Sequence, residues 1–172
     1  SGLPDDAEIK IVFGAMHGGD AANVIPTHCE LRASVRTPTL DVWNMLPELV
    51  ERCVAEVVAE SGAGFTVAYT HGVPPVVNDA GVTDVVTRAA TSEFGAESIA
   101  SVHQSWGGDD IPWFTREVPG SYVRLGVHDA DADGPRLDLH AGHFDVDERA
   151  IDLGVRLLVA TTKAYFEDAD AS

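Results

Sequence analysis

The sequence predicts a mixed α/β chain of two parts: a small β-sheet with helices on one face, joined to part of an α/β sheet. Segments that alternate apolar and polar residues stand beside longer segments with apolar residues at helical spacing. Their order is strand, strand, helix, strand before residues 71–79, and helix, short strands, helix after them. Adjacent prolines and an Asn-Asp end make residues 71–79 the best boundary between the two parts.

The first part opens with two predicted strands. Residues 8–16, EIKIVFGAM, are rich in β-branched and aromatic residues and stop at the turn sequence HGGD. Residues 29–37 alternate cleanly, with the apolar residues from Cys29 to Val35 on one face and charged or polar residues on the other. This alternation places Arg36 on the open face of the sheet.

A helix is predicted within residues 41–61, where apolar residues recur at helical spacing and a glycine follows. Pro47 conflicts with a continuous helix, because an interior proline costs about 3 kcal/mol. We therefore expect the helix to begin near Leu46, or to hold Pro47 in its first turn. Residues 64–70, GFTVAYT, are predicted to form a further strand.

The second part is predicted to contain two helices and short strands. An apolar stripe predicts a helix over residues 80–95, and strands are expected at 98–102 and 121–127. The last helix is expected to start at Asp145, with Glu148 completing a capping box. Three of its apolar residues are predicted to face inward: Ile151, Val155 and Leu158. So few strands make an incomplete doubly wound sheet.

The charge of the chain excludes two classes of partner. Eleven Lys and Arg against 28 Asp and Glu give a net charge of −17, which repels nucleic-acid phosphates and anionic lipid surfaces.

No apolar run approaches the roughly 18 residues that span a bilayer, and the start, SGLPDDAEIK, lacks the layout of a secretion signal. We expect a cytoplasmic protein. The opening Ser-Gly pair often remains after tag cleavage and indicates a fragment.

The cysteines indicate neither a disulfide framework nor a nucleophile. Cys29 and Cys53 fall in a predicted strand and helix without CxxC spacing, so both are expected to be buried thiols. His28 adjoins Cys29, but neighbouring residues of a strand point to opposite faces. With no GxSxG motif either, nucleophilic catalysis is set aside.

His140 is the first candidate for a metal ligand. It lies at a strand-to-helix transition next to Asp138 and an acidic helix start, and a neutral imidazole held by a carboxylate is a common ligand. The alternative is a loop histidine that bonds locally, and the claim of His143 is weaker. The other histidines show no HExxH or HxH spacing: His17, His28, His71, His103 and His128.

The segment SWGGDDIPWF, residues 105–114, is a second candidate site. Paired glycines let a backbone approach a ligand closely, and Asp109 with Asp110 could orient a metal-bound histidine. A tight turn with a helix N-cap explains the pattern equally well. The aromatic residues of the segment are expected in the core: Trp106, Trp113 and Phe114.

Asn23 and Arg36 form a third candidate site. An arginine on an open strand face, with an amide side chain from the preceding loop, can clamp a carboxylate bidentately. The alternative is that Arg36 pairs on the surface with Glu30 or Asp41.

Three segments in this order carry a resemblance: FGAMHGGDAANVIPTHCELRASVRT, SWGGDDIPWFTREVPGSYVRLGV and LHAGHFDVDERAIDLGVRLL. Together they resemble the carboxyl-terminal part of the two-metal amidohydrolase and peptidase family, which includes aminoacylases, hippurate hydrolase and indole-acetyl-amino-acid hydrolases. The resemblance implies that residues 1–74 are the second half of a ferredoxin-like lid or dimerisation domain. Residues 75–172 would be the carboxyl-terminal portion of a zinc-exopeptidase-like α/β catalytic domain.

The resemblance also implies roles for residues. It implies that Asn23, Arg36 and Gly108 bind the carboxylate-bearing substrate, and that His140 is the last metal ligand. Asp109 and Asp110 match the family's Gly-Gly-Glu-Asp-Phe segment near the site, although Asp109 replaces Glu and Ile111 replaces Phe. The family binds two divalent ions, zinc or manganese first, with cobalt or nickel also suited to such ligands.

The family supplies its general-base glutamate and its other metal ligands from the amino-terminal half, so the resemblance implies no catalytic residue in this chain. We therefore expect a fragment of a hydrolase of N-acyl amino acids or related peptides, inactive alone and homodimeric through the lid. The competing interpretation is a non-catalytic dimerisation or binding module derived from the same fold. A third is an acidic domain without a ligand.

Overall fold

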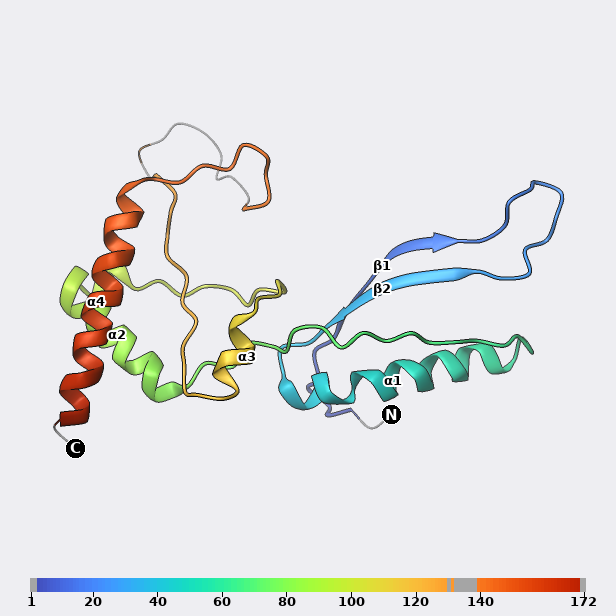
Figure 1. Ribbon diagram of the computed structural model, residues 1–172, viewed down its shortest axis with the longest axis horizontal. Coiled ribbons are helices and arrows are strands. Elements are labelled where there is room, and N and C mark those ends of the chain that lie inside the picture. Colours follow the sequence, from blue (N-terminus) through green and yellow to red (C-terminus); the bar gives the residue numbers. More distant parts are fainter. Residues whose placement is uncertain (1–2, 130, 132–138, 171–172) are drawn as a thin grey trace. The chain divides into compact units, whose positions relative to one another are not determined.

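The computed structural model of the protein describes residues 3–129, 131 and 139–170 (Figure 1). Its elements are, in chain order, β1 (Lys10–His17), β2 (Glu30–Arg36), α1 (Leu40–Ala59), α2 (Ala80–Phe94), the 3₁₀ turn η1 (Ala96–Ser98), α3 (Ile111–Thr115) and α4 (Arg149–Asp170). The chain divides into two compact units. Unit 1 comprises Ser1–Val77 with Gln104–Arg116, and unit 2 comprises Asn78–His103 with Glu117–Ser172.

Unit 1 contains the antiparallel hairpin of β1 and β2, which confirms both predicted strands (Figure 1). Lys10 lies opposite Arg36 at one end of the ladder, and His17 lies opposite Glu30 at the other. Val35 packs against the core of α1, whereas Arg36 is exposed. The exposed position of Arg36 is as predicted, but the strand is not half-buried along its length, because Leu31 on the same face as Val35 is 58% exposed.

The core of unit 1 lies on α1. Val42, Trp43 and Leu46 are buried, and Leu46 is fully inaccessible. The helix is confirmed, but the predicted start is wrong: α1 begins at Leu40 and carries Pro47 in its interior.

A side chain from beyond the helix compensates for Pro47. Proline has no N–H, so the Trp43 carbonyl, four residues earlier, has no helical donor. His71 Nε2 donates to that oxygen at 3.1 Å, and its ring stacks on Trp43 with centroids 3.6 Å apart. Because a carbonyl only accepts, this bond places the proton of the imidazole on Nε2. The helix therefore tolerates Pro47 because His71 supplies the hydrogen bond that proline cannot donate.

A double-mutant cycle tests this compensation. We expect His71→Ala to lower the free energy of unfolding by about 1–3 kcal/mol, because a partly buried carbonyl loses its donor. In a Pro47→Ala background the loss should be smaller by about 1 kcal/mol, since the new N–H can bond the Trp43 carbonyl. Urea unfolding followed by circular dichroism measures both. Equal losses in the two backgrounds would contradict the explanation.

Residues 64–70 form no β-ladder, so the predicted third strand is wrong. The segment runs extended beside α1 (Figure 1), and Tyr69 packs against the α1 core. A strand is defined by its ladder, and within the described residues only β1 and β2 pair. The apolar pattern of the segment therefore reflects packing on a helix.

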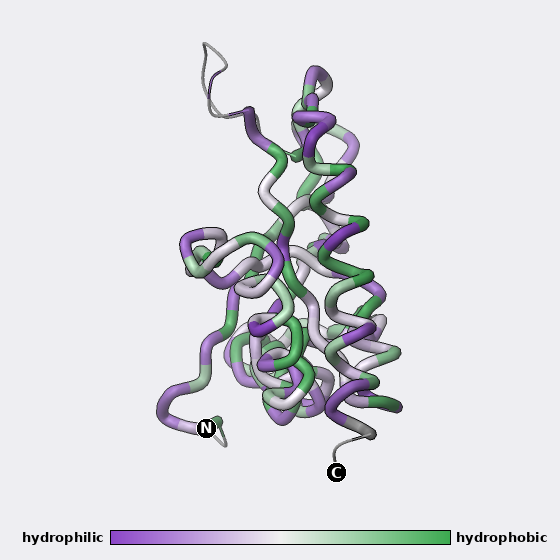
Figure 2. The backbone as a smooth tube through the Cα atoms, turned by 90° about the vertical axis from the view of Figure 1, so that its left-hand side faces the viewer, coloured by the Kyte–Doolittle hydropathy of each residue, from purple (hydrophilic) through white to green (hydrophobic). Residues whose placement is uncertain are grey.

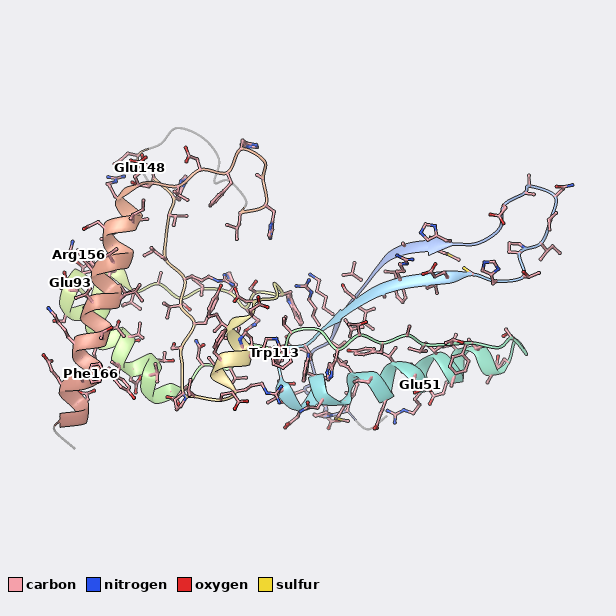
Figure 3. All side chains as sticks on the ribbon, viewed as in Figure 1. Glu51, Glu93, Trp113, Glu148, Arg156 and Phe166 are labelled. Carbon is pink, nitrogen blue, oxygen red and sulfur yellow. The ribbon has the colours of Figure 1, made fainter. Side chains whose placement is uncertain are left out.

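Unit 2 is built on the packing of α2 against α4, and α2 confirms the predicted helix. Asp79 caps it by accepting the Val82 N–H at 2.8 Å, and Gly95, with φ of 88°, ends it. Between the helices, Arg156 of α4 donates to Glu93 of α2 at 2.8 Å (Figure 3). The predicted stripe on α2 is buried or half-buried: Val82, Val85, Val86, Ala89, Ala90 and Phe94.

Two predictions for α4 are wrong. The helix begins at Arg149, and Asp145 instead accepts the N–H of Val146, four residues before the helix. Apolar and polar residues alternate along α4 (Figure 2), but its apolar stripe is exposed. The residues predicted to face inward are Ile151, Val155 and Leu158, which are 66%, 56% and 70% exposed. Within the described ranges, these three side chains are therefore exposed rather than part of a core.

The strands predicted at 98–102 and 121–127 are also wrong. Residues 121–127 run extended, but they bond to the start of α2: Tyr122 N donates to the Asn78 side chain at 2.8 Å, and Asn78 Nδ2 donates to the Tyr122 carbonyl at 3.0 Å. Side-chain bonds replace the expected ladder. None of the helices in ranges 3–129 and 139–170 combines the length and apolar character that crossing a bilayer requires.

Candidate functional site

The described residues do not by themselves form a metal centre. Within 3–129, 131 and 139–170, no three or more His, Cys, Asp or Glu side chains gather as a metal site requires. His140 and His143 are exposed in the turn before α4, where Phe144 N bonds the Ala141 carbonyl at 2.9 Å. Asp138, the predicted neighbour of His140, lies outside the described residues. The turn thus offers an accessible imidazole and not a complete ligand set.

An ion-pair network fixes the chain between this turn and α4. Arg149, the first residue of α4, bonds Asp147 through Nε at 2.7 Å and Asp129 through Nη2 at 2.7 Å. The hydrogen bonds from Arg149 hold the pKa of the Asp147 carboxyl below its ordinary value. The peptide N–H of Asp147 also donates to the Val127 carbonyl at 2.8 Å. These contacts tie the start of α4 to the preceding extended segment.

Arg36 is exposed at the end of β2, and its partner is a backbone carbonyl. Its Nη1 donates to the carbonyl oxygen of Trp106. Both alternative surface pairings are wrong: Glu30 binds Arg32 at 2.7 Å, and no ion pair among the described residues joins Arg36 to Asp41. The guanidinium therefore lies against the SWGGDD segment within unit 1.

Asn23 lies far from Arg36 within one chain. Asn23 is exposed in the loop that joins β1 to β2, whereas Arg36 ends β2 at the opposite end of the hairpin. A strand of seven residues spans roughly 20 Å at about 3.3 Å per residue. The predicted carboxylate clamp is therefore not assembled by a single copy of the chain.

Gly108, Asp109 and Asp110 come together in unit 1. With Val73 they line an open hollow of about 390 Å³. A side chain at residue 108 would crowd Val73, since a Cβ there would lie 3.1 Å from its Cγ2. Asp109 Oδ1 accepts the Ile111 N–H at 3.0 Å at the start of α3. The tight turn is therefore present, although the N-cap residue Asp110 makes no capping bond of its own, and an orienting role toward a metal ligand stays a prediction.

Arg116 holds α3 in place within unit 1. Its guanidinium carbon lies 5.7 Å from the Trp43 ring centroid and 5.6 Å from that of Trp113. Trp113 and Phe114 are nevertheless exposed, so the prediction that they are core residues is wrong, and Trp106 is half-buried. The prediction of buried thiols is also wrong, because Cys29 and Cys53 are exposed on the hairpin and on α1.

Two residues of unit 1 were missed by reasoning from the sequence. Lys10 pairs with Arg36 across the hairpin, and its Nζ lies 5.9 Å from the Trp106 ring centroid. His71 bonds the carbonyl that Pro47 leaves without a donor. The proline in a helical pattern was the available signal for a compensating donor, but strand register, which sets the partner of Lys10, has no local signal.

Comparison with protein families gives a match over nearly the whole chain. The model of peptidase family M20/M25/M40 matches residues 2–164. Among curated proteins, the chain is 38% identical over 153 residues to a putative glutamate–cysteine ligase from Rhodococcus jostii, covering 89% of this chain and 19% of that protein. It is 31% identical over 157 residues to a probable hydrolase from Synechocystis sp., covering 91% of this chain and 40% of that one.

A deacetylase and a solved structure extend the comparison. The chain is 26% identical over 162 residues to an N-acetyl-L-cysteine deacetylase from Bacillus subtilis, covering 94% of this chain and 37% of the deacetylase. It also superposes on the crystal structure of a Bacillus subtilis protein described as a dinuclear metal binding peptidase from the M20 family. The TM-score is 0.72 at 24% identity, covering 89% of this chain and 41% of that one. At 24% identity, this similarity shows a shared fold and nothing about a shared activity.

Proposed function

The chain belongs to peptidase family M20/M25/M40, and on this premise we propose that it forms part of a metal-dependent hydrolase of the amide bond of N-acyl amino acids or related peptides. The names of relatives support the reaction class: they include deacetylases of N-acetyl-L-cysteine and N-acetyldiaminopimelate, and carboxypeptidases. The Rhodococcus relative is named as a ligase, but the match covers only 19% of that protein. Ligase activity is therefore not proposed for this chain.

The chain spans between 19% and 40% of the length of the curated relatives it matches. We propose that activity belongs to a longer protein that contains these residues. In that protein, residues 1–74 would be the second half of a ferredoxin-like lid and residues 75–172 the carboxyl-terminal portion of the catalytic domain. The compact units part between Val77 and Asn78, which supports a division near this point, although Gln104–Arg116 belongs to the same compact unit as Ser1–Val77.

His140 is proposed to be one ligand of a two-ion centre in that longer protein, with zinc or manganese as the ions. An exposed imidazole suits either ion, but the described residues supply no cluster that would hold one alone. When bound, such ions polarise the amide carbonyl and activate a water molecule. The other ligands and the general base are assigned to residues outside this chain.

The contribution of this chain to substrate binding is proposed to be electrostatic. Arg36 would bind the substrate carboxylate, and Gly108 would let the substrate approach the backbone beside it. Because the hairpin separates Asn23 from Arg36, we propose that Asn23 serves the site of a second copy in a homodimer formed through the lid. Sedimentation across micromolar concentrations tests the dimer, and a monomer throughout would contradict it.

The proposed function is tested by comparing the 172-residue chain with the longer protein. With zinc or manganese and a panel of N-acyl amino acids, we expect turnover by the longer protein and none by the chain alone, because one imidazole falls short of three or four fixed ligands. A liquid-chromatography assay of the released amino acid measures both. Turnover by neither protein would favour a non-catalytic binding module, and turnover by the chain alone would contradict the assignment of the site.

A further inference from the structure

Two like charges stand side by side at one end of the hairpin. Lys10 and Arg36 are direct partners in the antiparallel register of β1 and β2. Directly opposite residues project from the same face of a sheet with Cβ atoms about 4.5–5.5 Å apart, and like charges in this position destabilise the pairing. The fold therefore holds two cations together against their repulsion.

Both cations are directed at the same residue, and the contacts are uncharged. Arg36 donates to the Trp106 carbonyl, and the Lys10 ammonium lies 5.9 Å from the centroid of the Trp106 ring. No carboxylate in the described part of the chain forms an ion pair with either, although the chain carries 28 Asp and Glu. By contrast, Arg32 of the same strand is neutralised by Glu30 at 2.7 Å. Among the residues that the structure describes, the positive charge of the pair is therefore not neutralised by an ion pair.

The geometry points to an anion as the missing compensation. Arg36 uses one N–H of Nη1 to bond the Trp106 carbonyl. A guanidinium has five N–H donors and an ammonium has three, so both side chains keep donors for a ligand. The two parallel N–H groups of a single arginine can bind one carboxylate. An adjacent ammonium can then bind a second carboxylate of the same ligand.

We propose that Lys10 and Arg36 together form a subsite for dicarboxylates, and that Lys10 determines a preference for N-acyl amino acids with an acidic side chain. The ligand class rests on the proposed function, whereas the subsite rests on the register pair and its contacts with Trp106. Lys10 is a specificity-determining residue in this arrangement.

The test compares two ligands that differ by one charge, N-acetylglutamate and N-acetylglutamine, binding to the 172-residue chain at low ionic strength. Isothermal titration is expected to give about tenfold tighter binding of N-acetylglutamate, which corresponds to about 1.4 kcal/mol. Lys10→Gln should bring the ratio of the two affinities close to one without weakening N-acetylglutamine. Arg36→Gln should weaken both ligands.

Lys163→Gln is the matched control, because it removes the same charge from α4 in unit 2 and should leave the ratio unchanged. An unchanged ratio in the Lys10 variant would overturn the proposal. Glutarate, a dicarboxylate without an acylamino group, tests the subsite independently of the proposed substrate class. If glutarate binds with the same dependence on Lys10 while neither N-acyl amino acid binds, the subsite stands and the proposed substrate class fails. If the wild-type chain binds none of the three, the subsite is refuted.

Discussion

Replacing His140 with alanine in the proposed longer protein is expected to lower kcat/KM for N-acyl amino acids by more than about 100-fold. Changes to residues that merely support a metal ligand already cost about 10- to 100-fold, so loss of a ligand should cost more. The bound metal should fall with the activity. Steady-state kinetics and elemental analysis of the same preparations measure the two effects together.

His143 provides the control for this prediction, because it is exposed in the same turn before α4. His143→Ala should leave kcat/KM within about threefold of the wild type, as surface substitutions usually do. If both variants lose activity equally, the turn matters through its conformation. If neither loses activity or metal, His140 is not a ligand.

Replacing Arg36 with alanine is expected to lower kcat/KM about 10- to 150-fold for substrates with a free carboxylate. A hydrogen bond to a charged group contributes about 1.5–3 kcal/mol, which corresponds to that range. Arg36→Lys should restore part of the loss, since an ammonium keeps the charge without the planar fork. Kinetics with N-acyl amino acids measure the change.

Two comparisons make the Arg36 prediction specific. Substrates whose carboxylate is converted to an amide should bind poorly to the wild type and lose little more in the variant. Arg32→Ala, on the same strand, should have little effect because Glu30 already neutralises Arg32. Equal losses with acid and amide substrates would show that Arg36 acts through the Trp106 carbonyl and not through the substrate.

The hairpin and α2 could be predicted from sequence because their signals are local. The alternation through β2 separates Val35, which packs on α1, from the exposed Arg36, and Asp79 with Gly95 marks the ends of α2. The strand predicted at residues 64–70 failed because an apolar, β-branched segment packs equally well on a helix. Ladder formation depends on a partner that the segment itself does not encode.

The exposed stripe of α4 shows a different limit. Ile151 and Leu158 have the spacing of a buried face, yet they are 66% and 70% exposed among the described residues. Periodicity predicts which residues share a face of a helix but not what covers that face. The same limit applies to the candidate metal site: the sequence indicates His140 as a candidate ligand, but no cluster of ligands forms among the described residues.

The distance between Asn23 and Arg36 could not be predicted without the topology. The two residues are close in sequence and belong to the same family-like segment. In a β-hairpin, however, the connecting loop with Asn23 lies a full strand length from the strand end with Arg36. The pairing of Lys10 with Arg36 could not be predicted for the same reason, since register alone fixes the partner of Lys10. Reasoning from sequence thus found the charged residues and missed how the strands distribute them.

The bond from His71 to the Trp43 carbonyl has a consequence for the order of folding. The first half of α1 completes its hydrogen bonding only when a residue 28 positions later docks on it. A peptide of residues 40–59 should therefore be poorly helical around its proline, and α1 should gain protection from hydrogen exchange together with the segment around His71. We therefore expect α1 and the segment around His71 to form and to unfold together.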